Sequence, residues 1–120
     1  YHWKHEPILY GWKPGAAHNW YADRSQTTVW EFDRPTASRE HPTMKPLDLI
    51  EYALGNSSAP DDIIYDGFLG SGSTLLAAQK MGGDRTVYGF ELSPAYCEII
   101  LQRFTKLTGI EPKLIGKLPD

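Results

Sequence analysis

The spacing of apolar residues over residues 47–120 predicts helices that alternate with strands. Leu47, Ile50 and Leu54 recur at helical intervals before Gly55, which predicts a helix that stops there. The same pattern predicts strands at residues 62–65, 86–91 and 113–116 and helices at residues 73–81 and 94–108. We therefore expect a β-α-β-α unit with parallel strands and right-handed crossover helices, which is an α/β fold.

The two ends of the last predicted helix carry the clearest local signals. Ser93 can cap its first turn, Pro94 suits its first position, and Gly109 suits its end. Its expected buried face is one apolar stripe, formed by Tyr96, Ile100, Phe104 and Leu107.

The first part of the chain follows a different pattern. The runs "PILYGWK" and "TTVWEF" are rich in aromatic and β-branched residues and are separated by a long loop, which predicts a wide antiparallel strand pair. A proline-rich connector, "RPTASREHPTMKP", follows. We expect one segment of a domain, with the strand pair and connector in residues 1–46 and the β-α-β-α part in residues 47–120.

Composition narrows the classes of function. The 120 residues are 41% hydrophobic, carry a net charge of −3, and contain no apolar run near the roughly 20 residues that cross a bilayer. A globular, cytoplasmic chain with no membrane partner is expected, and its charge does not suit a stand-alone binder of duplex DNA. The single Cys97 excludes an internal disulfide, and no histidine has an acidic or thiol partner at metal spacing, so no metal is expected.

The glycine-rich stretch "DGFLGSGST" at residues 66–74 indicates a backbone that approaches a ligand closely. A phosphate-binding loop of the nucleoside triphosphatases is disfavoured because Ser73 stands where that loop needs lysine. A dinucleotide loop is disfavoured because Leu75 replaces its third glycine. Glu91, at the end of the next predicted strand, suits two sugar hydroxyls, so an adenosine-type ligand with little or no phosphate is indicated. A plain turn and a solvated acid are the alternatives.

Three motifs together carry a family resemblance. "HPTMKP" at residues 41–46, "DGFLGSGST" at residues 66–74 and "GFELSPAYCEIILQRF" at residues 89–104 closely resemble the amino-methyltransferases of phage and prophage type that methylate adenine or cytosine in DNA. The opening residues resemble the segment that precedes these motifs, so the similarity runs from about Trp3 to Leu107. The resemblance implies a partial Rossmann-like methyltransferase fold, S-adenosylmethionine as cofactor, DNA as partner, and adenine N6 as the favoured acceptor.

The resemblance also implies roles for residues. Glu91 would hold the ribose hydroxyls, and the polar groups of the "HPTMKP" motif would reach the methionine part of the cofactor. The full set of expected cofactor-binding residues is His41, Thr43, Lys45, Asp66, Phe68, Gly70, Ser71, Gly72 and Glu91. Lysine and threonine suit a carboxylate, whereas an acid such as Asp66 suits an ammonium group.

Two departures from the family pattern matter. Gly67 stands where the family usually has proline, which predicts a more flexible start to the loop. The family's Asp/Asn-Pro-Pro-aromatic stretch, which holds the accepting amino group, is absent, so no catalytic residue is assigned. In the permuted subgroup that stretch comes first in the chain, so we expect it upstream of Tyr1. We therefore expect this segment to be inactive by itself. We also expect an open sheet edge that favours self-association.

The aromatic residues of the first part leave two interpretations open. An enzyme that extrudes a base needs aromatic faces for it and cations for phosphates, and the candidates for contact with DNA are Lys13, Trp20, Arg24 and Arg34. Packing among the rings is the favoured alternative, because cross-strand aromatic pairs are common. For the whole chain, the alternatives are a degenerate, non-catalytic binding module and a methyltransferase acting on RNA or on a protein amide.

Overall fold

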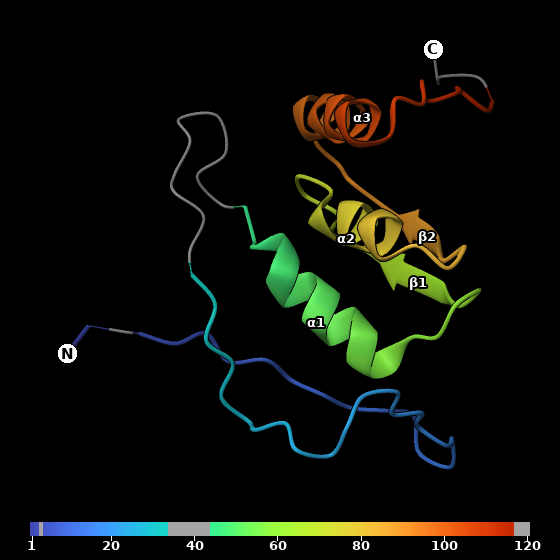
Figure 1. Ribbon diagram of the computed structural model, residues 1–120. Helices are drawn as coiled ribbons and strands as arrows, with labels where there is room; N and C mark the ends of the chain where they lie inside the picture. Colours follow the sequence, from blue (N-terminus) through green and yellow to red (C-terminus); the bar gives the residue numbers. More distant parts are fainter. Residues whose placement is uncertain (3, 34–43, 117–120) are drawn as a thin grey trace.

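The computed structural model describes residues 1–2, 4–33 and 44–116, and Figure 1 shows the path of the chain. The elements follow the order α1 (Leu47–Ser57), β1 (Ile63–Asp66), α2 (Ser73–Met81), β2 (Thr86–Gly89) and α3 (Pro94–Thr108). The two strands are parallel and pair Ile63 with Thr86 and Asp66 with Gly89. The predicted α/β unit with a crossover helix is therefore confirmed.

Helix α2 is the centre of the packing. It lies between α1 and α3 beside the strands, as Figure 1 shows. Its Leu76, Ala77 and Ala78 are at most 4% exposed, and Ile100 of α3 is 7% exposed. Alanine side chains let neighbouring backbones come close, so this small core holds three helices and two strands together.

The helix limits follow local signals. α2 spans the predicted residues, and its end at Gly82, with φ of 68°, matches the expected glycine. Pro94 and Gly109 bound α3 as predicted, but the Ser93 side chain makes no capping hydrogen bond. α1 runs on past Gly55 to Ser57 because its end is closed by Ser58, whose N–H donates to the Leu54 carbonyl at 2.8 Å.

The stripe predicted along α3 is partly right. Ile100 is buried, and Tyr96 and Phe104 are half-buried, whereas Leu107 is 46% exposed. The predicted strand at residues 113–116 is wrong. That stretch leaves α3 as an irregular segment, tied to the helix where the Thr105 hydroxyl donates to the Ile110 carbonyl at 3.3 Å.

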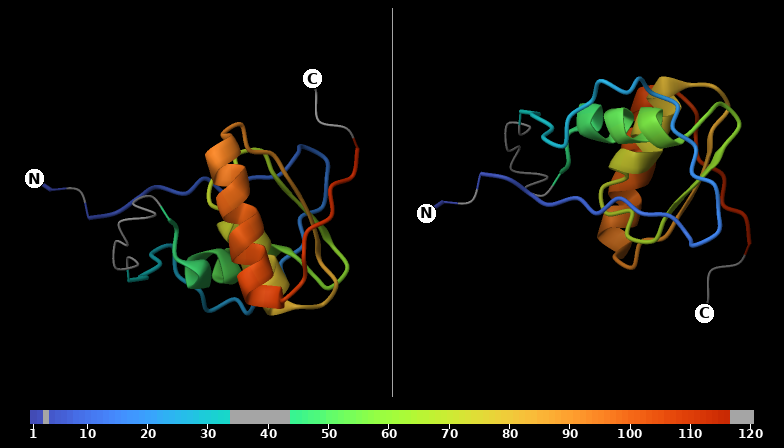
Figure 2. Two further views of the ribbon diagram at one scale, coloured as in Figure 1. Left: turned by 90° about the horizontal axis from the view of Figure 1, so that it is seen from above. Right: turned by 90° about the horizontal axis from the view of Figure 1, so that it is seen from below.

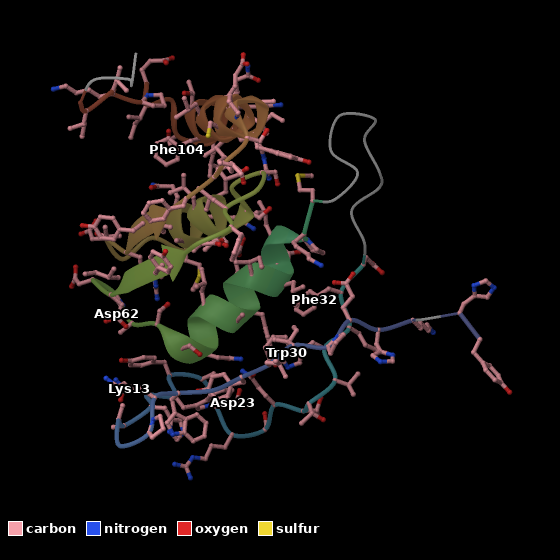
Figure 3. The ribbon with its side chains drawn as sticks, turned by 180° about the vertical axis from the view of Figure 1, so that it is seen from behind. Lys13, Asp23, Trp30, Phe32, Asp62 and Phe104 are labelled. Atoms are coloured by element: carbon pink, nitrogen blue, oxygen red, sulfur yellow. The ribbon has the colours of Figure 1, made fainter. Side chains whose placement is uncertain are left out.

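The predicted antiparallel pair is also wrong: the described residues between 1 and 33 form no strand. They run as an irregular chain beside α1, and the N-terminus projects from the body in both views of Figure 2. A lone two-stranded ribbon is marginally stable in water, and here the side chains find other partners. Trp30 and Phe32 contact Tyr52 of α1, with ring centroids 4.9 and 5.7 Å apart (Figure 3).

Backbone and amide groups hold the same segment on α1. The Tyr21 N–H donates to the Asn56 carbonyl at 2.9 Å, and the Gln26 amide donates to the Asn56 side chain at 2.7 Å. Asn56 is only 3% exposed, so these bonds are shielded from water. The described residues of the first part thus cover α1 and add no strand to the sheet.

One face of the sheet is open. Tyr65 pairs with Tyr88, and paired residues of parallel strands project to the same side. Ile63, Tyr65, Tyr88 and Phe90 are each at least 57% exposed, whereas Ile64 and Val87, which project to the opposite side, are half-buried. Aromatic and aliphatic groups on the first side therefore remain in contact with solvent.

Among the residues that the structure describes, none of the helices has the length and apolar character that crossing a membrane requires.

Candidate functional site

The loop from Gly67 to Gly72, between β1 and α2, is held in shape by Asp66. One carboxylate oxygen, Oδ1, accepts from the Phe68 N–H at 3.0 Å, and the other, Oδ2, accepts from the Thr74 hydroxyl at 2.7 Å. The first bond is the local turn that an aspartate makes with the backbone two residues later. The second spans the whole loop, so Asp66 fixes both its start and its end.

Glu91, two residues after the end of β2, also holds the loop. Its Oε2 accepts from the Gly70 N–H at 2.8 Å, and its Oε1 accepts from the Ser93 N–H at 2.8 Å. The Leu69 N–H adds a bond of 2.8 Å to the Phe90 carbonyl. The structure thus brings Gly70 and Glu91 together, as adjacent parallel strands predict. A carboxylate has about four acceptor positions, so Glu91 can still accept from further donors.

Two glycines of the loop have backbone conformations that side chains disfavour. Gly70 has φ of 55° and Gly72 has φ of 81°. A Cβ added at Gly72 would also lie 3.1 Å from Cγ1 of Ile100. Because the loop and α3 are this close, the glycine at 72 is required by both conformation and space.

A third support comes from α3. The Arg103 guanidinium donates to the Ser71 carbonyl from 32 residues along the chain. Partial burial of this group lowers the pKa of Arg103 from its ordinary value. Sequence reasoning missed both Arg103 and Thr74. The i, i+3 spacing of Ile100 and Arg103 could have placed the arginine on the buried side of α3, but nothing in the sequence names its acceptor.

Gly89 was also missed as a site residue, although it is the first residue of the third motif. A Cβ there would lie 2.7 Å from Cδ2 of Leu69. The end of β2 therefore presses against the loop without room for a side chain. A glycine inside a predicted strand is the signal that could have indicated this contact.

The backbone of Lys45 lies near the glycine-rich loop, whereas its side chain pairs with the N-terminal segment. The Ser73 hydroxyl donates to the Lys45 carbonyl at 3.5 Å, which places Lys45 at the start of α2. The Lys45 ammonium forms an ion pair with Glu6 of the N-terminal segment, and both side chains are more than half exposed. His41 and Thr43 lie outside the described residues. Phe68, expected under the cofactor, is 94% exposed.

Trp20, a candidate for contact with DNA, belongs to an aromatic cluster that we define as Tyr10, Trp12, His18 and Trp20. Trp12 stacks on His18 with ring centroids 4.1 Å apart, and Tyr10 meets Trp20 edge to face at 6.2 Å. Part of each ring is therefore used in packing, which favours the packing interpretation.

Lys13 and Arg24 lie close to this cluster. Lys13 starts a turn closed by the Ala16 N–H, and Arg24 lines a surface hollow with Trp20 and Asp23. Figure 3 labels Lys13 and Asp23 on this side of the molecule. Arg34 lies outside the described residues. Trp20 and Arg24 thus line one hollow, and Lys13 follows Trp12 of the cluster in the chain. The glycine-rich loop has separate contacts with Asp66, Glu91 and Arg103.

Comparison with known proteins places this loop in a family. The sequence model described as DNA methylase, of the N6/N4 methyltransferase type, matches residues 2–102. The type II methyltransferase M2.MboI of Moraxella bovis is 30% identical over 92 residues, which are 73% of this chain and 33% of that protein. M1.MboII of the same organism is 41% identical over 61 residues, which are 51% of this chain and 23% of that protein.

Solved structures agree with the family match. The crystal structure of the M1.HpyAVI–SAM complex matches with a TM-score of 0.58 and 27% identity, over 71% of this chain and 43% of that one. The cytosine-N4-specific PvuII DNA methyltransferase matches with a TM-score of 0.51 and 26% identity, over 60% of this chain and 29% of that one. The prediction of a Rossmann-like methyltransferase fold is therefore confirmed.

The chain spans about a third of M2.MboI and less than half of the M1.HpyAVI chain. The family match itself covers far more than half of the 120 residues and includes the glycine-rich loop, Glu91 and the first part of α3. The chain belongs to the DNA methylase family of the N6/N4 type.

Proposed function

We propose that this chain is the cofactor-binding part of an S-adenosylmethionine-dependent DNA methyltransferase that acts on an exocyclic amino group of a base, with adenine N6 as the favoured acceptor. The observation that carries the proposal is the bond from the Gly70 N–H to Glu91, because it joins the glycine-rich loop to the acid that suits a ribose. The crystal structure of M1.HpyAVI with SAM supports the choice of cofactor.

The donor and acceptor groups at the loop fit the parts of such a cofactor. Glu91 keeps acceptor positions for two sugar hydroxyls beside its two backbone bonds. Asp66 likewise keeps acceptor positions for an ammonium group, while it holds the loop through Phe68 and Thr74. The glycines carry no side chain that would keep a ligand away from the loop backbone. When bound, the cofactor supplies an electrophilic methyl group on a sulfonium centre.

Lys45 would have to exchange its partner Glu6 for the cofactor in order to bind it. Its ammonium pairs with Glu6 and would meet the carboxylate of the ligand only by sharing or leaving that pair. Because the pair is exposed to water, the exchange costs little. We retain Lys45 as a proposed ligand of the carboxylate, together with His41 and Thr43 of the same motif. Phe68, Ser71 and Gly72 complete the proposed set.

Methyl transfer needs a group that holds the accepting amino nitrogen. The 120 residues contain no two consecutive prolines, and hence no Asp/Asn-Pro-Pro-aromatic stretch. We therefore propose that this chain binds the cofactor and does not transfer the methyl group by itself. DNA remains the proposed partner, with Lys13, Trp20, Arg24 and Arg34 as proposed contacts.

Titration calorimetry tests the proposal. The chain is titrated with S-adenosylmethionine and with S-adenosylhomocysteine, and Glu91→Ala is compared with Glu98→Ala, an exposed acid on α3 that bonds only to Gln102 among the described contacts. We expect binding by the chain and by Glu98→Ala, and at least tenfold weaker binding by Glu91→Ala. A folded chain that gives no heat with either compound at millimolar concentration would refute the proposal.

A transfer assay separates cofactor binding from catalysis. Labelled S-adenosylmethionine is incubated with the chain and with double-stranded DNA, RNA or protein as acceptors. Binding without label in any acceptor is the expected result. Label in RNA or protein, and none in DNA, would replace the proposed acceptor, and label in DNA would show that the chain carries its own catalytic group.

A further inference from the structure

The glycine-rich loop has a further support from α3, at a residue of the third motif to which the resemblance assigned no role. Asp66 holds it from β1 and Glu91 from the end of β2, but both act on its ends and on Gly70. The last peptide of the loop, between Ser71 and Gly72, is held at its N–H by the Leu69 carbonyl, at 2.8 Å, and at its carbonyl by Arg103 of α3. The end of the loop therefore depends in part on a helix that begins after the second strand.

The contact with α3 is close and has a definite geometry. Ile100 and Arg103 are three residues apart, so they share a face of the helix. Ile100 fills the space that a side chain at Gly72 would need, with its Cγ1 and Cγ2 3.1 and 3.2 Å from the position of a Cβ. Ile100 thus sets how near the loop can come, and Arg103 sets how the Ser71 peptide is turned.

The orientation of that peptide decides which groups the loop offers to a ligand. With the Ser71 carbonyl directed at α3, its oxygen is occupied by a charged donor. The torsions beside this peptide belong to Ser71 and Gly72, and Gly72 has a positive φ and no side chain. The Gly72 N–H donates to the Leu69 carbonyl at 2.8 Å, so the bond from Arg103 adds a second restraint, on the oxygen of the same peptide. An unrestrained loop loses more conformational entropy on binding.

We propose that Arg103 is a positioning residue of the cofactor site, which fixes the Ser71 carbonyl against α3 and so preorganises the glycine-rich loop. The identity of the ligand in this proposal rests on the proposed function. The order of the loop is a property of the unliganded chain and can be measured without that function. The role of Arg103 and the proposed function can therefore fail separately.

The test uses three variants of the full chain. Arg103→Met removes the donor and the charge and keeps an unbranched apolar stem, whereas Arg103→Lys keeps a cationic donor of different shape. Lys106→Met removes an exposed charge from the last turn of the same helix and is the matched control. Backbone amide NMR spectra report loop order without ligand, and calorimetry with S-adenosylhomocysteine reports affinity.

We expect Arg103→Met to broaden or shift the amide signals of Ser71 and Gly72 while those of α1 stay in place. Its affinity should fall about tenfold, Arg103→Lys should recover part of the loss, and Lys106→Met should bind within twofold of the parent chain. Unchanged loop signals in Arg103→Met would overturn the proposal, as would equal losses of affinity in Arg103→Met and Lys106→Met.

Two further outcomes remain informative. If Arg103→Met does not fold, Arg103→Lys decides by the signals of Ser71 and Gly72, which should shift, and their constancy would overturn the proposal. If the parent chain binds neither cofactor compound, the proposed function fails, and the loop signals of the variants still decide whether Arg103 orders the loop.

Discussion

Replacing Gly72 with alanine tests how closely α3 approaches the glycine-rich loop. Gly72 has φ of 81° and ψ of 21°, which is the left-handed region. An alanine there costs about 1–2 kcal/mol in backbone energy. Its Cβ would lie 3.1 and 3.2 Å from two carbons of Ile100, which is closer than ordinary contact, and overpacking of this kind costs about 1–3 kcal/mol. The total loss in free energy of unfolding should be about 3 kcal/mol.

Gly109 provides the matched control. It ends α3 with φ of 71° and ψ of 5°, nearly the same conformation, and a Cβ there would meet nothing within 4 Å. Gly109→Ala should therefore show only the backbone cost of about 1–2 kcal/mol. The difference between the two variants measures the crowding against Ile100. Urea unfolding followed by circular dichroism gives both values, and a loss of 3 kcal/mol moves the midpoint by about 1.5 M at a slope of about 2 kcal/mol/M.

A double variant isolates the contact itself. Ile100→Ala removes Cγ1 and Cγ2, and as a buried substitution it should cost about 2–4 kcal/mol alone. In Gly72→Ala/Ile100→Ala the two changes relieve each other, so the combined loss should be smaller than the sum by about 1–2 kcal/mol. Strict additivity, or equal losses in Gly72→Ala and Gly109→Ala, would refute the reasoning that α3 presses on the loop.

Three further predictions concern other parts of the molecule. Glu91→Gln keeps the shape of the acid but replaces one acceptor oxygen with an amide donor that faces a backbone N–H. It should therefore lower the free energy of unfolding by about 1–2 kcal/mol in urea unfolding, whereas the control Glu98→Gln should leave that free energy unchanged. Glu6→Gln frees the Lys45 ammonium for a ligand carboxylate and should tighten binding of S-adenosylmethionine two- to threefold in calorimetry, and weaker binding would contradict this. Tyr65→Glu places a charge on the open face of the sheet and should lower self-association in sedimentation velocity, whereas Leu114→Glu, an equally exposed position outside the strands, should not.

The helices and strands after residue 46 could be predicted because their signals are local. Pro94 and Gly109 bound α3, and Gly82 ends α2, each for a reason that a single residue carries. The sequence pattern predicted the end of α1 too early, because the helix tolerates Gly55 in its interior and ends where the Ser58 N–H bonds to the Leu54 carbonyl. Local patterns thus predicted the order and type of these elements, whereas the end of α1 depends on a backbone hydrogen bond that no single residue type signals.

The first part of the chain could not be predicted in the same way. Its aromatic runs indicate apolar, extended segments, but they do not say what covers them. Trp30 and Phe32 contact Tyr52 of α1, and the amide of Gln26 reaches Asn56. These partners are 20 or more residues away, and choosing α1 over a second strand depends on the whole packing.

The candidate site was predictable where sheet geometry decides it. Parallel neighbours bring the end of β1 beside the end of β2, which is why Gly70 and Glu91 meet. Thr74 and Arg103 were not predicted, because each acts through a side-chain hydrogen bond whose acceptor has no signal in the sequence periodicity. The acceptor of Thr74 is the Asp66 carboxylate, and the acceptor of Arg103 is the Ser71 backbone carbonyl. Gly89 could have been found, because a glycine within a strand marks a close approach.

The three supports of the loop come from three elements, β1 through Asp66, the end of β2 through Glu91, and α3 through Arg103. None of the three bonds involves the N-terminal segment, whose Glu6 forms an exposed ion pair with Lys45. The shape of the loop therefore follows from how β1, β2 and α3 are assembled. Changes in the aromatic cluster should leave that shape unaltered, because a rearrangement among residues 10–20 breaks none of the contacts that hold it.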